Sequence, residues 1–437
     1  MRVVTQRDAQ HCGPLPPGPS APVSWQTIEW IVRPTALLRR SAARYGVPFT
    51  LRTLWADAPM VLVSAPEDVR KVFSAPPAVL RGGGSAVLEP FAGPSSLLVL
   101  SGEEHLRRRR LMLPAFHGDR MRAYAPMIAE LAERELDAWP RGRAVRTHER
   151  MQALTLEVML RVVLGAREEA GALRAAIEDA LAIVRSAPRL VAMSVLRRDA
   201  PFRRAVERVD ALLYALIAKR RAAGAAAEES VLGSLVAKGA GWRGAEGSGW
   251  TDAEVRDQLV TLLAAGHETT ATALAWAFER LGRDPALVAA LREGDEALLE
   301  ATVKEVLRIR PVLSVAPREV VEPFELADGR TLPPGVQVAA CLYLAHRRAE
   351  SFPPDPLAFR PRRWLDGPKP PPYAWIPFGG GDRRCLGAAF AEMELREVLR
   401  AAVARWRLEP AGPPRGERVR RRAVSLTPAG GGRVIAW

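Results

Sequence analysis

The sequence predicts a mainly α-helical protein with a smaller β part, and three features support this prediction. Residues 146–240 contain almost no strand-like stretch and are rich in Ala, Leu and Arg, which favour helices. Thr251 and Glu254 form a capping box that opens a long helix extending to about residue 281. After residue 311, prolines alternate with β-forming residues, as in short strands and loops.

The remaining elements are predicted from apolar patterning and from capping signals. In chain order they are strands at 47–55 and 60–64, a helix opened by Ser64-Ala-Pro66-Glu67 with Ser64 as its cap, helices at 103–113 and 118–137, one or two helices in 286–310, and a last helix that starts just after Cys385.

Cysteine usage and hydrophobicity indicate where the protein resides. Cys12, Cys341 and Cys385 are an odd number without CxxC spacing, which argues against a disulfide framework and for a reducing compartment. No apolar run approaches the roughly 18 residues that a membrane span needs, and the first residues lack the apolar core of a signal peptide. We therefore expect a cytoplasmic protein without a membrane span.

One short apolar pattern near the N-terminus has two interpretations. Trp25, Ile28 and Ile31 could form a small apolar face, which Pro34 interrupts. Such a face could touch a membrane, but ordinary packing against the protein is the more common use. We therefore expect these side chains to be packed inside.

The charge balance is strongly basic, with 63 Lys and Arg against 49 Asp and Glu, a net charge of +14. Such a surface attracts nucleic acid or an acidic protein. A nucleic-acid-binding protein would show basic clusters interleaved with aromatic residues or a recognition motif, and neither is present. We therefore expect no nucleic-acid partner.

The stretch FGGGDRRCLG at residues 378–387 carries the strongest chemical signal. A thiolate just before a helix meets free backbone N–H groups and the positive end of the helix dipole, and Arg383 and Arg384 add positive charge. A lone cysteine cannot complete a zinc site, but one thiolate suffices as the protein ligand of a haem iron. The alternative is a buried or redox-sensing cysteine.

The complete pattern favours the haem interpretation. Phe378, Gly381, Arg383, Cys385 and Gly387 match F-x-x-G-x-R-x-C-x-G, which closely resembles the haem-binding signature of the cytochrome P450 monooxygenases. The resemblance covers residues from about 14 to 434. It implies the cytochrome P450 fold, with residues 21–437 as a single haem domain behind a Pro-rich lead at 1–20. It also implies haem b (iron protoporphyrin IX) held by Cys385 as the metal ligand, with Phe378, Gly379, Arg383 and Gly387 around it.

A second motif, AAGHETT at residues 264–270, lies inside the predicted long helix. It resembles the P450 signature in which Glu268 and Thr269 are an acid–alcohol pair for proton delivery to O₂, with Ala265 and Gly266 lining the oxygen and substrate space. The alternative for a polar patch in a helix is packing against a neighbouring element.

A third set of residues matches positions that bind the haem propionates in the family. His105 and Arg109 share one helix face in the H-x-x-x-R pattern, and Arg318 resembles a further propionate-binding arginine. The neighbouring arginines could face solvent. His346 is also typical of the family, with either a structural role or a haem contact.

Two further motifs are assigned to fold maintenance. Glu305 and Arg308 match the family's E-x-x-R, and in P450s this pair engages a later P-x-x-F-x-P-x-R-W segment. That segment is present here and includes Arg363 and Trp364.

The implied reaction inserts one oxygen atom from O₂ into a substrate while two electrons and two protons reduce the other atom to water. No flavin or nicotinamide domain fits beside the haem fold, so the resemblance implies a separate ferredoxin or flavodoxin with its reductase. A basic face near Cys385 would steer an acidic partner, with Arg107, Arg108, Arg383 and Arg384 as candidates. We expect a monomer.

Substrate contacts are expected from variable segments at 82–100, 185–201, 262–269, 312–316 and 425–427. The candidates are mostly apolar, which favours a lipophilic substrate, although core packing is an equal alternative for many of them. They are Leu88, Phe91, Leu97, Leu98, Leu263, Val312, Leu313, Val315 and Leu426. The rival functions are a peroxide-driven or isomerising haem-thiolate enzyme and a non-catalytic haem protein. The latter would not need the Glu268–Thr269 pair.

Overall fold

The computed structural model describes residues 14–54, 58–82, 89–116, 118–165, 170–185, 200–223, 230–241 and 250–437. Over these residues the chain is mainly helical, as the sequence predicts. The helices are α1 (Val23–Val32), α2 (Pro34–Tyr45), α3 (Pro66–Ser74), α4 (Glu89–Ala92), α5 (Gly102–Met112), α6 (Asp119–Asp137), α7 (Thr147–Leu164), α8 (Ala170–Arg185), α10 (Ala200–Ala222), α11 (Val231–Gly241), α12 (Asp252–Leu281), α13 (Pro285–Arg292), α14 (Glu296–Ile309), α15 (Leu342–Ala345) and α16 (Ala388–Arg405).

The strands are short and come from both halves of the chain. They are β1 (Phe49–Leu51), β2 (Met60–Val63), β3 (Leu80–Gly82), β4 (Ala144–Arg146), β5 (Ala316–Val320), β6 (Phe324–Glu325), β7 (Thr331–Leu332), β8 (Gln337–Ala340), β9 (Leu408–Pro410), β10 (Val419–Arg422), β11 (Ser425–Pro428) and β12 (Arg433–Ala436). The largest sheet has the order β1-β2-β8-β5-β3, and within it only β2 and β8 run parallel.

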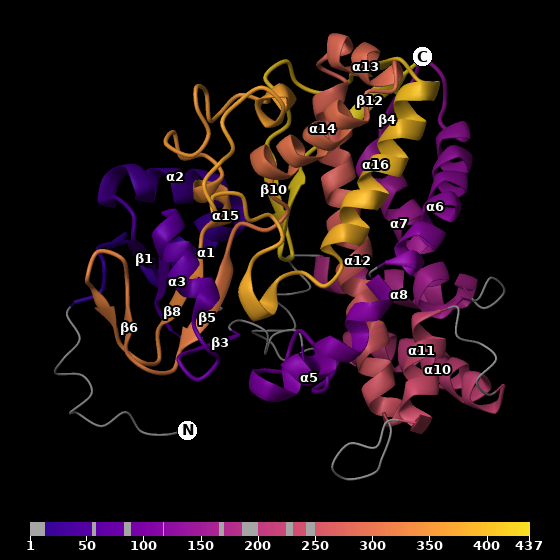
Figure 1. Cartoon of the computed structure of the whole chain (residues 1–437), viewed down its shortest axis with the longest axis horizontal. Coiled ribbons are helices and arrows are strands. Elements are labelled where there is room, and N and C mark those ends of the chain that lie inside the picture. Colours follow the sequence, from indigo (N-terminus) through magenta and orange to yellow (C-terminus); the bar gives the residue numbers. More distant parts are fainter. Residues whose placement is uncertain are drawn as a thin grey trace.

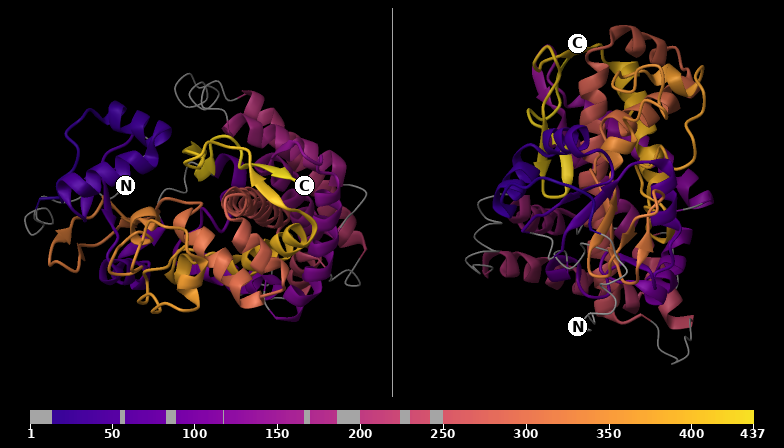
Figure 2. Two further views of the ribbon diagram at one scale, coloured as in Figure 1. Left: turned by 90° about the horizontal axis from the view of Figure 1, so that it is seen from above. Right: turned by 90° about the vertical axis from the view of Figure 1, so that its left-hand side faces the viewer.

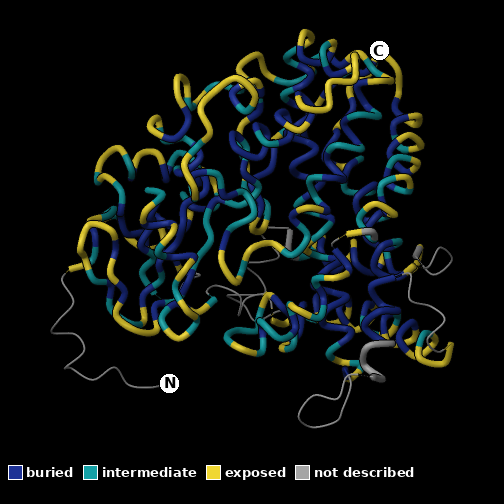
Figure 3. Tube along the Cα trace, in the orientation of Figure 1, coloured by how far each residue is buried: buried dark blue, intermediate teal, exposed yellow. Residues whose placement is uncertain are grey.

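The elements form a sheet-rich side and a helical side (Figure 1). The five-stranded sheet lies beside α1, α2 and α3, while α6, α7, α12, α14 and α16 gather on the other side. Seen from above, α12 is viewed nearly end-on among the other helices (Figure 2). The main hydrophobic core includes residues of α6, α7, α12 and α16. The central helix α12 is mostly buried, and the middle of the helical side appears dark in Figure 3.

The long central helix α12 begins where the sequence predicts. The Glu254 backbone N–H donates to Thr251 Oγ1 at 3.2 Å, and the Thr251 N–H donates to Glu254 Oε2 at 2.8 Å. Together these two bonds satisfy backbone donors that the first helical turn leaves free. The predicted Ser64 cap is wrong, since α3 has Ala65 at its N-cap and no side-chain cap bond.

Stretch 286–310 forms two helices because two aspartates cap separate starts. Asp284 accepts from the Leu287 N–H at 2.9 Å, and Asp295 accepts from the Leu298 N–H at 2.8 Å. Within the described ranges, none of the helices combines the length and apolar character that crossing a membrane requires.

Helix α1 does not pack as the sequence predicts. Trp25 is 55% exposed and Ile28 is 50% exposed, so the expectation that these apolar side chains are packed inside is wrong. The buried side of α1 instead carries Gln26, Thr27 and Trp30. This side is held by hydrogen bonds, which local sequence patterning does not reveal.

Candidate functional site

Cys385 lies in a loop that leads into α16. The Cys385 N–H donates to the Phe378 carbonyl at 2.9 Å, which closes the loop. The thiol is accessible, yet protein atoms surround it closely enough that burial raises its pKa, while the Gly387 N–H and the Arg109 and Arg384 guanidinium groups lower it. Burial outweighs these three groups, so the net effect raises the pKa of the thiol, while the groups themselves favour the thiolate form that a metal ligand requires.

Two glycines of the loop are required by the close approach of α3. A Cβ at Gly380 would lie 2.2 Å from Phe73 Cδ2. Gly381 has a φ of +63°, and a Cβ there would lie 2.0 Å from the Phe73 carbonyl oxygen. Gly379 and Gly387 have nothing within 4 Å of such a Cβ, so open space lies beside them.

A fully buried ion-pair network supports this loop from behind. Arg308 makes two hydrogen bonds of 2.8 Å to the Glu305 carboxylate, and Arg363 Nε donates to Glu305 Oε1 at 3.0 Å. Trp364 Nε1 donates to Glu305 Oε2 at 3.0 Å. The carboxylate and both cations are thus mutually satisfied, which a buried charge requires.

His346 connects the same network to the start of the cysteine loop. Arg308 Nη1 donates to the His346 carbonyl at 2.7 Å, and the Ile376 N–H donates to His346 Nε2 at 2.9 Å. Burial lowers the pKa of His346 to about 3, so the ring is a neutral acceptor. Of the two roles left open by the sequence, the structure supports the structural one.

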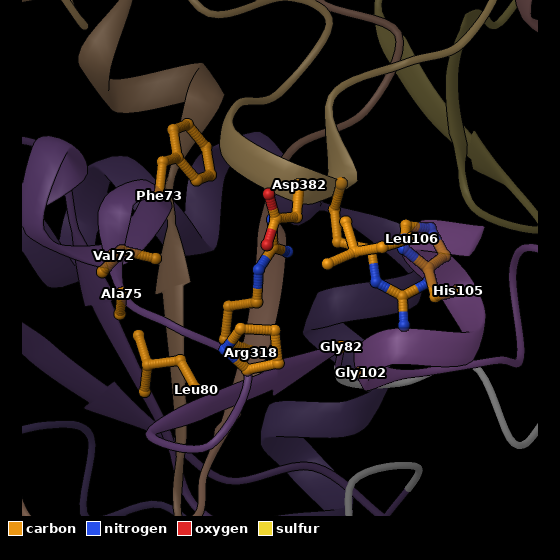
Figure 4. A pocket seen from close by; sticks show the side chains of 12 residues that line it. Val72, Phe73, Ala75, Leu80, Gly82, Gly102, His105, Leu106, Arg318 and Asp382 are labelled. Atoms are coloured by element: carbon orange, nitrogen blue, oxygen red, sulfur yellow. The ribbon is translucent and has the colours of Figure 1, made fainter. Parts of the chain in front are cut away.

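Three arginines and His105 lie close to one another beside the loop, and Figure 4 shows His105 and Arg318 of this group. His105 from α5 and Arg318 from β5 line one pocket with Asp382 and Arg383 of the loop. Burial first, and then the charges of Arg383, Arg109 and Arg318, lower the pKa of His105 to about 3, so its ring is neutral. Burial and then the charge of Arg383 lower the pKa of Arg318 to about 10. Such crowded positive charge favours binding of an anionic group.

Arg383 is directed inward rather than toward solvent. Its guanidinium donates to the Leu97 carbonyl at 2.9 Å and to Ser101 Oγ at 3.0 Å. Gly82 allows this position, because a Cβ there would lie 2.3 Å from Arg383 Nη2.

The predicted acid–alcohol pair lies in the middle of α12. Thr269 Oγ1 donates to the Ala265 carbonyl at 2.6 Å, while Glu268 is directed toward α7. There Gln152 Nε2 donates to Glu268 Oε2 at 2.6 Å, and His148 Nε2 lies 3.7 Å from Glu268 Oε1.

The polar contacts of His148 extend beyond α7. His148 Nε2 lies 3.2 Å from Thr272 Oγ1, and its Nδ1 lies 3.3 Å from Arg422 Nη1. The sequence interpretation missed Gln152, His148 and Arg422. The i, i+4 spacing of His148 and Gln152 on one helix face could have indicated the first two.

Gly266 faces α7, not open space. A Cβ at this position would lie 2.5 Å from Met159 Sδ, so the glycine allows α7 and α12 to pack closely. Ala265 is exposed although most of α12 is buried. The oxygen-side groove expected beside both residues stays a prediction.

Comparison with known proteins identifies the fold family. A family model described as "Cytochrome P450" matches residues 16–431. The chain belongs to the cytochrome P450 family. Members of this family bind haem through a cysteine thiolate and use O₂ in monooxygenase reactions.

Two mycobacterial P450s illustrate the relationship over the full length. Cytochrome P450 135B1 of Mycobacterium tuberculosis is 40% identical over 96% of this chain and 91% of its own length. Cytochrome P450 138 of Mycobacterium bovis is 38% identical over 99% of this chain and 98% of its own. The structure of retinoic acid-bound cyanobacterial CYP120A1 covers 97% of this chain and 99% of its own at a TM-score of 0.84 and 23% identity, which shows the fold.

The residues of this P450 fit haem. The iron requires one anionic protein ligand, and Cys385 is an accessible thiol with one N–H and two guanidinium groups that favour its anion. The propionates require fixed cations, and the cluster of His105, Arg109, Arg318 and Arg383 is short of negative charge.

The predicted substrate residues of the P450 fall into three groups. Leu88 and residues 186–199 lie outside the described part of the chain. Leu97, Leu263 and Leu426 are at most 8% exposed, which favours the core-packing alternative, and their contact with substrate stays a prediction. The others are partly or largely accessible and stay candidates for substrate contact: Phe91, Leu98, Val312, Leu313 and Val315.

The four arginines expected to steer a redox partner differ in their burial and contacts. Arg108 is buried, stacks 4.5 Å from the Trp250 ring centre and pairs with Glu254, so its assignment to a surface is wrong. Arg383 is engaged inside the protein, as described above. Arg107 is half-buried and bonds Glu104. Arg384 is exposed and remains the best candidate.

Proposed function

We propose that this P450 is a haem-thiolate monooxygenase that oxidises a lipophilic substrate with electrons from a separate redox protein. The observation that carries the proposal is the exposed Cys385 in a loop with a fixed backbone, next to the cluster of Arg109, Arg318 and Arg383. When bound, haem supplies the chemistry that activates O₂. The roles below are those of the protein's own residues.

In this proposal, Cys385 would be the thiolate ligand that holds the haem iron. The Gly387 N–H and the nearby Arg109 and Arg384 favour its anionic form. Arg109, Arg318, Arg383 and His105 bind the propionates, with the arginines as charge-assisted donors. The Glu305–Arg308–Arg363 network takes no part in the chemistry, because its groups are buried and hydrogen-bonded to one another.

Glu268 and Thr269 deliver protons. The Thr269 hydroxyl is within reach of the Ala265 carbonyl, so it can exchange that bond for one to a bound water or to O₂. The Glu268 carboxylate is held from α7 by Gln152 and can pass protons between that polar cluster and the site. Both residues lie on one turn of α12, which keeps the relay short.

The substrate class follows from the accessible candidates. Phe91, Leu98, Val312, Leu313 and Val315 present apolar surface, which favours a lipophilic molecule. The electron donor is a ferredoxin or flavodoxin served by a reductase. Exposed Arg384, next to Cys385, is suited to meet an acidic partner.

The spectrum of the reduced protein with carbon monoxide tests the central bond. We expect the long-wavelength band that gives the family its name in the wild type, and its complete loss in Cys385→Ala. Cys341→Ala is a matched control, because Cys341 is buried and burial raises its pKa to about 12. A Cys385→Ala protein that kept the band would refute the assignment.

A further inference from the structure

Helix α1 presents its apolar side chains to solvent. Trp25, Ile28 and Val32 are 55%, 50% and 61% exposed. Their spacing of i, i+3 and i+7 places them in one stripe along the helix. Leu54, which is 66% exposed, lies beside α1, because its N–H donates to Thr27 Oγ1 at 2.9 Å. We call these four side chains the α1 apolar face.

The opposite side of α1 is buried although it carries polar groups. Gln26 Nε2 donates to the Ala21 carbonyl at 2.8 Å, and its Oε1 accepts from the Arg52 N–H at 3.0 Å. Trp30 packs into the cluster around the five-stranded sheet. Rotating α1 to bury its apolar face would break these hydrogen bonds, so the orientation is built into the fold.

The α1 apolar face lies at the edge of the molecule. The N-terminal helices lie at the outer edge of the sheet-rich side (Figure 2). Contiguous apolar surface of this kind is unusual on a protein without a binding partner there. Something apolar therefore covers it in the working protein.

The charge around this face indicates the occupant. Residues 14–54 contain five arginines and one glutamate. That glutamate, Glu29, pairs with Arg40 at 2.5 Å. Arg33 directly follows the stripe and Arg52 precedes Leu54 by two residues, and both are exposed. An apolar face with cations at its margin is complementary to a bilayer that carries anionic headgroups.

We propose that the α1 apolar face attaches this protein peripherally to an anionic phospholipid bilayer. Trp25, Ile28, Val32 and Leu54 enter the boundary between headgroups and acyl chains, and the neighbouring arginines bind headgroup phosphates. A second copy of the chain is a poorer occupant, because a two-fold contact would bring the same cations of both copies together. This attachment does not depend on the reaction that the haem site performs.

Sedimentation with sucrose-loaded vesicles tests the proposal on the haem-loaded full chain. One set of vesicles is phosphatidylcholine alone and the other contains phosphatidylcholine and phosphatidylglycerol. We expect binding to the second set, weakened by salt, and little binding to the first. The triple variant Trp25→Ser, Ile28→Ser, Val32→Ser lowers the vesicle-bound to free ratio by about tenfold or more. The double variant Arg33→Gln, Arg52→Gln lowers it specifically on anionic vesicles.

Matched controls alter exposed residues elsewhere. Leu357→Ser removes a leucine that is 66% exposed, equal to Leu54, and Arg415→Gln removes an exposed arginine. Both keep wild-type binding, and thermal unfolding verifies that all variants are folded. The proposal is overturned if the wild type binds neither vesicle type, or if the triple variant binds as well as wild type. It is also overturned if the wild type is a dimer that the triple variant converts to a monomer.

Discussion

At the scale of single residues, burial decides which protonation state a side chain can adopt. His346 is fully buried, and its Nε2 accepts a backbone hydrogen bond that anchors the cysteine loop. Protonation would remove this acceptor and place a charge beside Arg308 and Arg347, whose charges also lower its pKa. The ring therefore stays neutral in the folded protein.

This neutrality makes stability depend on pH. The pKa of His346 is about 3 when folded and about 6.5 when unfolded, so the unfolded state takes up a proton first as pH falls. The contribution is complete above the unfolded pKa and declines from there toward pH 3. When the pH falls from roughly 8 to 5, we expect protonation of His346 in the unfolded state alone to lower the free energy of unfolding by about 2 kcal/mol.

Urea unfolding of the holoprotein at the two pH values measures this contribution. His346→Gln keeps a side-chain acceptor but cannot titrate, so its stability should fall by about 2 kcal/mol less than that of the wild type over the same interval. An identical fall in both proteins would show that His346 is not the group responsible.

Gln152 supplies a second prediction at the residue scale. Its amide holds Glu268 Oε2 at 2.6 Å, so Gln152→Leu releases the carboxylate from α7. We expect the fraction of electrons that reach product to fall roughly fivefold and peroxide to rise, a smaller loss than the ~100-fold contribution of a complete acid catalyst.

The carbon monoxide spectrum of Gln152→Leu should be unchanged, which separates proton delivery from haem binding. Gln152→Glu brings a like charge to Glu268 and should uncouple the enzyme further. If both variants turn over with wild-type coupling, Gln152 has no role in positioning the acid.

At the scale of elements, glycines determine how closely the cysteine loop and α3 approach. Gly379 and Gly381 both have positive φ, at +67° and +63°. Only Gly381 also has the Phe73 carbonyl oxygen 2.0 Å from a would-be Cβ. Substituting alanine at Gly379 therefore tests backbone strain alone, whereas alanine at Gly381 adds a collision with α3.

We expect Gly379→Ala to cost about 1 kcal/mol of unfolding free energy, from its left-handed backbone alone. Gly381→Ala adds the displacement of α3 and should cost roughly 3 kcal/mol, with faster loss of haem. Urea unfolding followed by haem absorbance measures both. Equal losses in the two variants would show that contact with α3 does not constrain the loop.

At the scale of the whole molecule, the charge of +14 favours encounters with acidic partners. Most arginines near the cysteine loop are engaged inside the fold, so the local steering charge is concentrated at Arg384. We expect Arg384→Glu to slow reduction by an acidic ferredoxin or flavodoxin about tenfold at low salt, and less at high salt.

Stopped-flow reduction measures this effect. Arg415→Glu, which makes the same charge change on the β9–β10 connection, serves as the control for net charge. Equal slowing by both variants would assign the effect to overall charge and exclude a docking contact at Arg384.

Local sequence alone was enough to predict the parts of this protein that depend on short-range spacing. The capping box at Thr251 predicted the start of α12, and the pattern around Cys385 predicted the P450 fold. These predictions succeed because helix capping, and the surroundings of a thiolate at a helix start, involve residues within a few positions of one another.

Only the tertiary structure decided which side of each element faces inward. It buried Arg108 against Trp250, directed Glu268 to Gln152 on α7, placed Leu263 in the core and turned the apolar side of α1 outward. Each outcome depends on a partner distant in sequence, and burial is a property of the surroundings rather than of the residue. Sequence patterning therefore identified the family and the candidate site residues, while packing decided how those side chains are oriented.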